Sequence, residues 1–290
     1  MATISDNAAA RTAALTILAM IAFAANSLLC RLALGEALID AASFMTVRMA
    51  SGAAILSLIM LQRGGHVPRR ADWRTVVMLF TYMAFFSFAY RWLSAGTGAL
   101  ILFGAVQLTM FVMALRAGEH FSPVSWIGLA AAALGLVYLV SPGLTAPDPA
   151  GAVLMAVAGI SWGFYSLLGR GAPDPLEATA GNFVWAVPLT LVVSGASVAD
   201  FHVSTHGLAL AVASGAIASG CGYVIWYAAL GGLTATRAAT VQLTVPIIAA
   251  FGGVMLLSEQ VTLRLLVASA ATLGGVALVV TQRAAKAQPR

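Results

Sequence analysis

The chain has 290 residues, of which 61% are hydrophobic and only 9% are charged, and it carries a formal net charge of +5. A soluble domain has about 25% charged residues, so this chain cannot cover a surface that faces water. The composition therefore excludes a soluble enzyme, a nucleic-acid-binding module and a receptor with a large domain outside the bilayer. It predicts an all-α polytopic membrane protein.

Apolar runs long enough to cross a bilayer, which takes about 20 residues, occupy most of the chain. These runs are continuous rather than alternating, which argues against membrane strands. In chain order we predict ten transmembrane helices, at residues 12–34, 42–62, 73–93, 97–116, 123–141, 150–169, 177–195, 206–229, 234–257 and 263–282. The first resembles a signal peptide at its start, but its apolar sequence continues through Leu34, which favours an uncut helix.

Basic residues predict the orientation of these helices. If both termini are cytoplasmic, eleven of the 15 Lys and Arg residues lie on the inner side, and an even number of spans agrees with this arrangement. The outer side then holds the other four, which are Arg31, Arg48, Arg91 and Arg264. We therefore expect a multi-pass protein of the inner membrane with cytoplasmic termini.

An internal repeat links the two halves of the chain. Residues 26–31 (NSLLCR) are matched by residues 165–170 (YSLLGR), and residues 106–109 (VQLT) by residues 241–244 (VQLT). There are two further matches, 90–93 (YRWL) with 227–230 (YAAL), and Glu119 with Glu259. All four matches occur in the same order in both halves. The repeat predicts two units of five helices, at residues 12–141 and 150–282.

An odd number of spans in each unit means that the two units insert with opposite orientations. Inverted repeats are typical of secondary transporters, whose substrate site lies near the membrane midplane between the halves. One difference between the units lies in the spacing from Gln107 to Glu119 and from Gln242 to Glu259, which is five residues shorter in the first unit. It predicts either a shortened or broken fourth span that contributes to a cavity, or a deletion without consequence.

These features resemble the drug/metabolite transporter superfamily, of the EamA-domain type. The resemblance rests on the two five-span repeats and on 227–230 (YAAL), the Ala-rich residues 235–240, Pro246 and Glu259 in the second one. The first repeat departs from the pattern, because Phe111 lies near the place that corresponds to Pro246. The resemblance implies a transporter, and the aromatic content makes the chain most similar to aromatic amino-acid exporters.

Candidate substrate-binding residues are the few non-aliphatic side chains at mid-depth, because a polar group there faces the bundle interior or a wet cavity. They are Asn26, Tyr82, Gln107, Trp162, Tyr165, Trp185, Tyr223 and Gln242. Packing against other helices is the alternative for the aromatic residues, and an interhelical hydrogen bond is the alternative for the two glutamines. Pro246 is a candidate gating residue, with a passive bend as its alternative.

Residues that the chain lacks narrow the function further. No Asp or Glu lies at the centre of a predicted span, which disfavours a multidrug carrier of lipophilic cations. An intramembrane enzyme is disfavoured because no nucleophile has a partner base, and we expect no cofactor and no metal. Glu119 and Glu259 lie at span ends, where we expect an ordinary pKa of about 4.3 and therefore transport without obligatory proton exchange.

The sequence thus predicts a secondary transporter that exports small metabolites, aromatic or apolar amino acids above all, by alternating access at a central cavity. Its expected partners are the small-molecule substrate and the lipid bilayer, with no nucleic acid. A multidrug efflux carrier of the same fold is the alternative.

Overall fold

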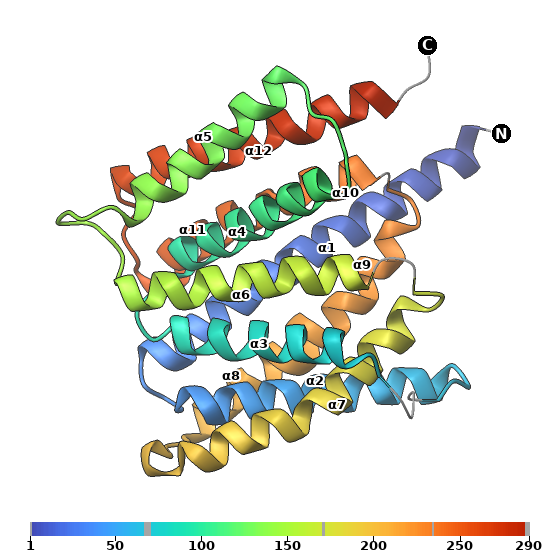
Figure 1. Ribbon diagram of the computed structural model, residues 1–290. Helices are drawn as coiled ribbons and strands as arrows, with labels where there is room; N and C mark the ends of the chain where they lie inside the picture. The colour runs from blue at the N-terminus through green and yellow to red at the C-terminus, as the bar shows by residue number, and fades with distance from the viewer. Residues whose placement is uncertain (1, 67–70, 170–171, 234, 288–290) are drawn as a thin grey trace.

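The computed structural model describes residues 2–66, 71–169, 172–233 and 235–287. Arg170, which ends the second copy of the repeat motif, lies outside these residues. Figure 1 shows the described elements, which are α1 (Ala2–Gly35), α2 (Ala41–Gln62), α3 (Trp73–Ala89), α4 (Ala95–Arg116), α5 (Pro123–Val140), α6 (Pro149–Leu168), α7 (Pro175–Ala196), η1 (Val198–Asp200), α8 (Thr205–Val212), η2 (Ala213–Cys221), α9 (Gly222–Leu230), α10 (Ala235–Gln242), α11 (Thr244–Leu257) and α12 (Leu263–Ala287).

Helix lengths confirm the all-α membrane fold. Among the described residues, nine helical stretches are long and apolar enough to cross a membrane, and α3 is a shorter apolar helix of 17 residues. Together they correspond to the ten predicted spans. The third was predicted to reach residue 93, but α3 ends at Ala89 and a turn follows. Short polar side chains accept hydrogen bonds from backbone N–H groups where α2, α4 and α6 begin, and thereby fix these starts.

The two halves of the bundle run in opposite directions. In Figure 1, α1 runs away from the end of the molecule that carries both termini, whereas α6 starts at the far end and runs back. The contacts between the two halves follow the same pattern from either side. Helix α1 packs on α9 and α11 of the second half, and the equivalent helix α6 packs on α3 and α4, which are the counterparts of α9 and α11 in the first half. In the pairs α2–α7, α4–α11 and α5–α12, a helix of the first repeat packs against the equivalent helix of the second repeat. The chain therefore forms two inverted five-helix repeats.

Irregular backbone is concentrated in the second half. The eighth span is divided into α8, α9 and the π-helical η2 of nine residues between them, and the ninth span is interrupted at Leu243 between α10 and α11. Pro246 lies in the first turn of α11 and cannot donate to the carbonyl of Gln242, which explains the interruption. By contrast, α4 is an unbroken helix of 22 residues. The prediction of a shortened or broken fourth span is therefore wrong.

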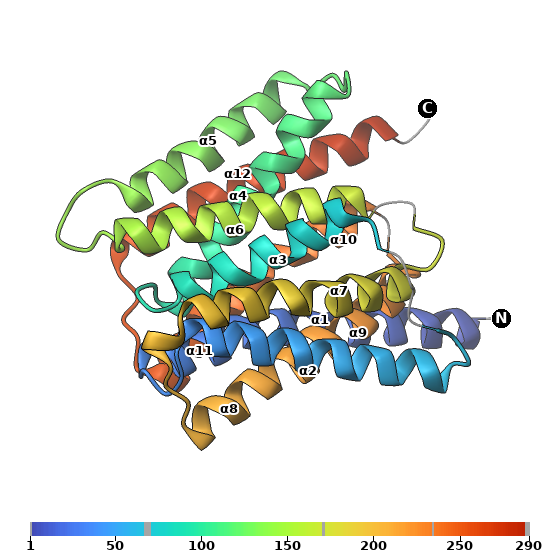
Figure 2. The ribbon, with the colours of Figure 1, turned by 60° about the horizontal axis from the view of Figure 1, so that its bottom comes forward.

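Small residues allow two of the closest helix contacts. A Cβ atom built on Gly128 of α5 would lie 2.5 Å from the carbonyl oxygen of Gly275 in α12, and one built on Gly215 of η2 would lie 2.1 Å from the carbonyl oxygen of Arg48 in α2. Backbones approach closely only where no side chain intervenes. Figure 2 shows α5 and α12 side by side along one edge of the bundle, and α2 and α7 on the opposite side of it.

Candidate functional site

A cavity of about 720 Å³ lies between the two repeats. Its wall is formed by α1, α3, α4 and α5 of the first half and by α6, α7, η2, α9, α10 and α12 of the second. Cavities of this size hold drug-sized or smaller molecules. The cavity therefore lies where inverted-repeat transporters bind their substrates.

Seven of the eight predicted substrate-binding residues line this cavity, namely Asn26, Tyr82, Gln107, Trp162, Tyr165, Tyr223 and Gln242. Trp185 does not belong to this wall, and its assignment as a substrate-binding residue stays a prediction. Its ring instead packs edge-on against Trp73 on α3, with 6.0 Å between ring centroids. Pro246 is buried in α11 and also lies outside the cavity wall, so any gating role would act through the α10–α11 interruption.

The aromatic residues of the wall form one continuous group. Trp162 on α6 lies between Tyr82 on α3, with ring centroids 4.8 Å apart, and Tyr223 on α9, with ring centroids 5.6 Å apart and planes at 26°. Tyr165 stacks on Trp162 as well. The wall includes further aromatic residues that sequence analysis did not select, which are Phe23, Phe86, Phe111, Trp226 and Tyr227. The surface suits a flat, apolar group.

The amide side chains occupy two different settings. Gln107 and Gln242, at equivalent repeat positions, both lie half-buried in the cavity wall, and they make no hydrogen bond to each other among the described residues. Asn26 is almost fully buried, donates to Ser219 Oγ at 3.1 Å and accepts from Ser214 Oγ at 2.6 Å. Asn26 therefore joins α1 to η2 while it also lines the cavity.

Arg48 is the main residue that sequence analysis misplaced. It was assigned to the outer end of the second span, but it lies well inside α2 with no exposed surface. Its Nη2 donates to Tyr82 Oη at 3.2 Å and to Ser219 Oγ at 3.5 Å, and its guanidinium lies 4.6 Å from the centre of the Phe86 ring. A basic residue surrounded by apolar sequence was the available signal. On insertion scales such a residue costs about 2.5–3.5 kcal/mol at a helix centre.

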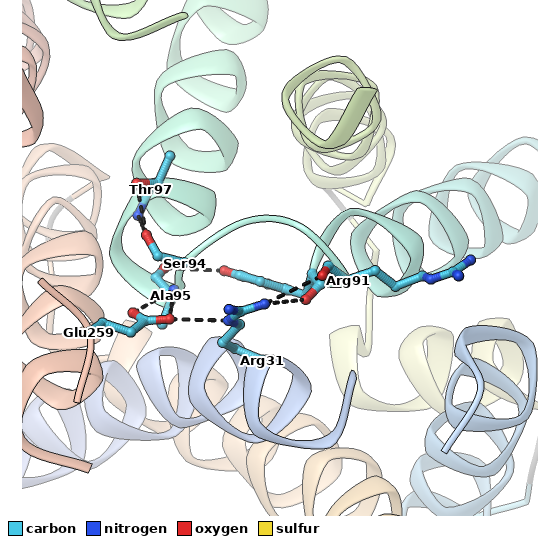
Figure 3. Close-up of polar contacts among 7 residues, drawn as sticks. Arg31, Arg91, Ser94, Ala95, Thr97 and Glu259 are labelled. Carbon is cyan, nitrogen blue, oxygen red and sulfur yellow. Dashed lines mark hydrogen bonds and ion pairs between the residues drawn. The ribbon is translucent and has the colours of Figure 1, made fainter. Parts of the chain in front are cut away.

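A group of polar contacts, drawn in Figure 3, lies at the end of the bundle opposite to the termini. Arg31 Nε at the end of α1 lies 3.2 Å from Glu259 Oε1, which lies between α11 and α12. The same carboxylate accepts from the backbone N–H of Ala95 at 2.9 Å, at the start of α4. Arg31 also donates to the carbonyl oxygens of Tyr90 and Arg91. We call this group the Arg31–Glu259 contact.

Glu259 is more enclosed than its position at a span end predicted. Its side chain is 13% exposed. Burial raises the pKa of Glu259, while the Ala95 N–H and the Arg31 guanidinium oppose the rise without cancelling it. The expected ordinary pKa at this position is therefore wrong.

At the other end the cavity extends to the link between α6 and α7. Gly169 and Ala172 of this link belong to its wall, together with Pro175 at the start of α7 and Leu230 at the end of α9. This is the end of the bundle that carries both termini in Figure 1. The cavity therefore reaches toward one end of the bundle, and the Arg31–Glu259 contact lies at the other.

Comparisons with known proteins agree with this geometry. The model of the family described as EamA-like transporter family matches residues 10–141 and again residues 149–281. The chain is 48% identical over 278 residues to an uncharacterized protein of Pseudomonas aeruginosa, covering 96% of this chain and 97% of that protein. It is 23% identical over 227 residues to an uncharacterized transporter of Archaeoglobus fulgidus, with coverages of 74% and 81%.

More distant similarities extend to a third curated protein and to a solved structure. The uncharacterized transporter YoaV of Bacillus subtilis is 20% identical over 237 residues, which is 77% of this chain and 81% of YoaV. A crystal structure of 20% identity has a TM-score of 0.64 and covers 92% of this chain and 98% of that one. At this identity the likeness shows the fold alone.

Proposed function

The chain belongs to the EamA-like transporter family, and from that premise we propose that it exports aromatic and other apolar amino acids. The observation that carries the proposal is the aromatic wall of the central cavity, where Tyr82, Trp162 and Tyr223 lie in ring contact. Such a wall binds a flat apolar side chain through stacking worth about 0.5–1.5 kcal/mol beyond burial. The volume of about 720 Å³ accommodates one amino acid with its water.

Two features support alternating access as the mechanism. The cavity reaches toward the end that carries the termini, and the Arg31–Glu259 contact joins the two repeats at the opposite end. With both termini in the cytoplasm, as the distribution of basic residues predicts, this is the form that loads substrate from inside the cell. Breaking the contact and closing the α6–α7 end would release the substrate outside.

A multidrug carrier of the same fold is the rival function. A carrier of lipophilic cations needs negative charge at its binding site, and the described lining residues include neither Asp nor Glu. The charged side chain buried beside this cavity is the cation Arg48. Both observations favour a substrate with a negative or zwitterionic polar group.

Flux into proteoliposomes that contain the purified protein tests the proposal. We expect faster uptake of phenylalanine, tyrosine and leucine than of glycine or lysine, with the solute chemically unchanged on arrival. Uptake should stop at equal concentrations when no pH gradient is present. Saturable uptake of organic cations without uptake of any amino acid would instead establish the multidrug function.

A further inference from the structure

No acidic side chain balances the charge of Arg48 among the residues that the structure describes. The side chain is fully buried, its Nε and Nη1 atoms have no hydrogen-bond partner, and it forms no ion pair with any described residue. The guanidinium lies over the faces of Phe86 and Tyr82, which compensate a cation only in part. A buried cation without an anion is costly, so an anion beside Arg48 would lower the free energy of this arrangement, and the described residues supply none there.

The groups between Arg48 and the cavity are arranged as donors. Tyr82 Oη accepts from Arg48 Nη2, and Ser219 Oγ accepts from both Arg48 and Asn26. Each hydroxyl oxygen is thus already used as an acceptor, and among the described residues neither O–H proton has an acceptor of its own. Both residues line the cavity. The cavity wall therefore presents two hydroxyl donors, polarised by one guanidinium, to whatever occupies it.

We propose that an anionic group of the substrate binds where Tyr82 and Ser219 meet the cavity, with Arg48 as its counter-charge. This inference rests on the proposed function and narrows it: the transported solutes carry one carboxylate next to an aromatic or apolar group. A single guanidinium balances a single negative charge, which favours a monocarboxylate over a phosphate dianion. The aromatic rings around Trp162 lie next to this place and receive the remainder of the substrate.

Binding of two matched probes to the purified full-length protein tests this assignment apart from transport. 3-Phenylpropanoate and 3-phenylpropanamide differ only in the charged group, and Trp162 in the wall provides a fluorescence signal. We expect the carboxylate to bind about tenfold more tightly than the amide, which equals about 1.4 kcal/mol. In Arg48→Gln this ratio should fall to about one, whereas the exposed Arg91→Gln should keep the wild-type ratio.

A second variant guards against misfolding of Arg48→Gln. The double substitution of Tyr82→Phe with Ser219→Ala retains the guanidinium and removes both hydroxyl donors, and it should lower the ratio several-fold. The assignment is overturned if the wild-type protein binds the two probes equally. It is also overturned if the ratio of carboxylate to amide binding is unchanged in every variant of Arg48, Tyr82 and Ser219 that folds. Carboxylate-selective binding without amino-acid flux would leave this inference standing and refute the proposed function alone.

Discussion

Trp162 occupies the centre of the aromatic wall, in contact with Tyr82 from the first repeat and Tyr223 from the second. Each ring makes its own contact with the neighbouring rings and also borders the cavity. Losing one ring therefore removes a stacking surface for the substrate without opening the bundle to lipid. At the scale of single residues, specificity should depend on these three side chains.

Replacing Trp162 by Ala should reduce transport of aromatic amino acids several-fold more than transport of leucine. The physical reason is the stacking contribution of about 0.5–1.5 kcal/mol that only a flat side chain gains. Proteoliposome uptake of both substrates measures the difference. Trp185→Ala is the matched control, because that ring packs against Trp73 away from the cavity and its loss should affect both substrates equally. An equal loss for both substrates in Trp162→Ala would identify Trp162 as a packing residue.

The position of a residue within its predicted span identified most of the residues that line the cavity. It did not show in which direction each side chain points. Neighbouring residues on a helix differ by about 100° around its axis, so Trp185 and Trp162 have similar depth and yet point to different places. Arg48 was misplaced for a different reason, because basic residues were assigned to span ends as a class. Its burial depends on Tyr82 and Ser219 from two other helices, which no local pattern reveals.

At the scale of elements, the Arg31–Glu259 contact joins α1, the start of α4 and the link between α11 and α12. Glu259 accepts from both a guanidinium and a backbone N–H, so this one carboxylate connects three segments. Because α1 and α4 belong to the first repeat and Glu259 to the second, separation of the repeats at this end must break the contact.

Glu259→Ala should therefore open this end of the bundle more often. Cys30, buried beside Arg31 on α1, is a native reporter of that opening. In a Cys221→Ser background, we expect a water-soluble maleimide to label Cys30 several-fold faster after Glu259→Ala. Glu36→Gln changes an exposed carboxylate near the same end and should leave the rate unchanged. Labelling that is equally slow in all three proteins would show that the contact does not control this end.

The protonation of Glu259 should bias the same opening. Burial raises the pKa of Glu259 while the end is closed, and contact with water after opening returns it toward about 4.3. The closed form therefore binds a proton more tightly, so lowering the pH through the raised pKa favours closure and raising it favours opening. The ratio of the Cys30 labelling rates in wild type and Glu259→Gln should rise with pH, since that ratio cancels the reactivity of the thiol itself. A ratio that is constant with pH would contradict this sign.

The contact between α2 and η2 gives a prediction about stability. A Cβ on Gly215 would meet the carbonyl oxygen of Arg48 and the hydroxyl of Ser51, both at 2.1 Å. Gly215→Ala should destabilise the protein by about 1–3 kcal/mol, the usual cost of overpacking, and thermal unfolding in detergent measures it. Gly274→Ala is the matched control, since nothing lies within 4 Å of its Cβ position. An unchanged midpoint for Gly215→Ala would mean that the two backbones move apart at little cost.

At the scale of the whole molecule, the packing of the two repeats against each other separates the features that the sequence predicted from those that it did not. Hydrophobic runs and the repeat predicted the ten spans and their inversion, because both are encoded within single segments. The π-helical η2 was not predicted from the sequence, whereas the interruption at Leu243 follows from Pro246, where the sequence analysis gave a bend as one alternative. The predicted break in the fourth span is absent. Helix α4 ends nine residues after Gln107 and α11 ends fifteen residues after Gln242, but α4 begins twelve residues before Gln107 whereas α10 begins seven residues before Gln242. The shorter spacing therefore moves the glutamine along the span without shortening the span.

Orientation in the membrane is the remaining prediction at this scale. Both termini lie at one end of the bundle, and the basic residues predict that this end is cytoplasmic. A reporter that is active only on the non-cytoplasmic side of the membrane should stay inactive when fused after Arg290 and become active when fused after Leu144 in the loop between α5 and α6. The opposite pattern of activity would reverse the direction of transport proposed above.

The pairing of α5 with α12 has a consequence for the order in which the protein is made. Helix α5 is complete at Val140, but its main neighbour α12 begins only at Leu263, so nearly all of the second repeat enters the membrane first. Until then the face of α5 that carries Gly128 and Gly135 has only lipid or other chains to pack against. Ribosomes that stop before α12 therefore release a chain in which this face of α5 lacks its main partner. Helix α12, the last described helix, is the one that covers this face.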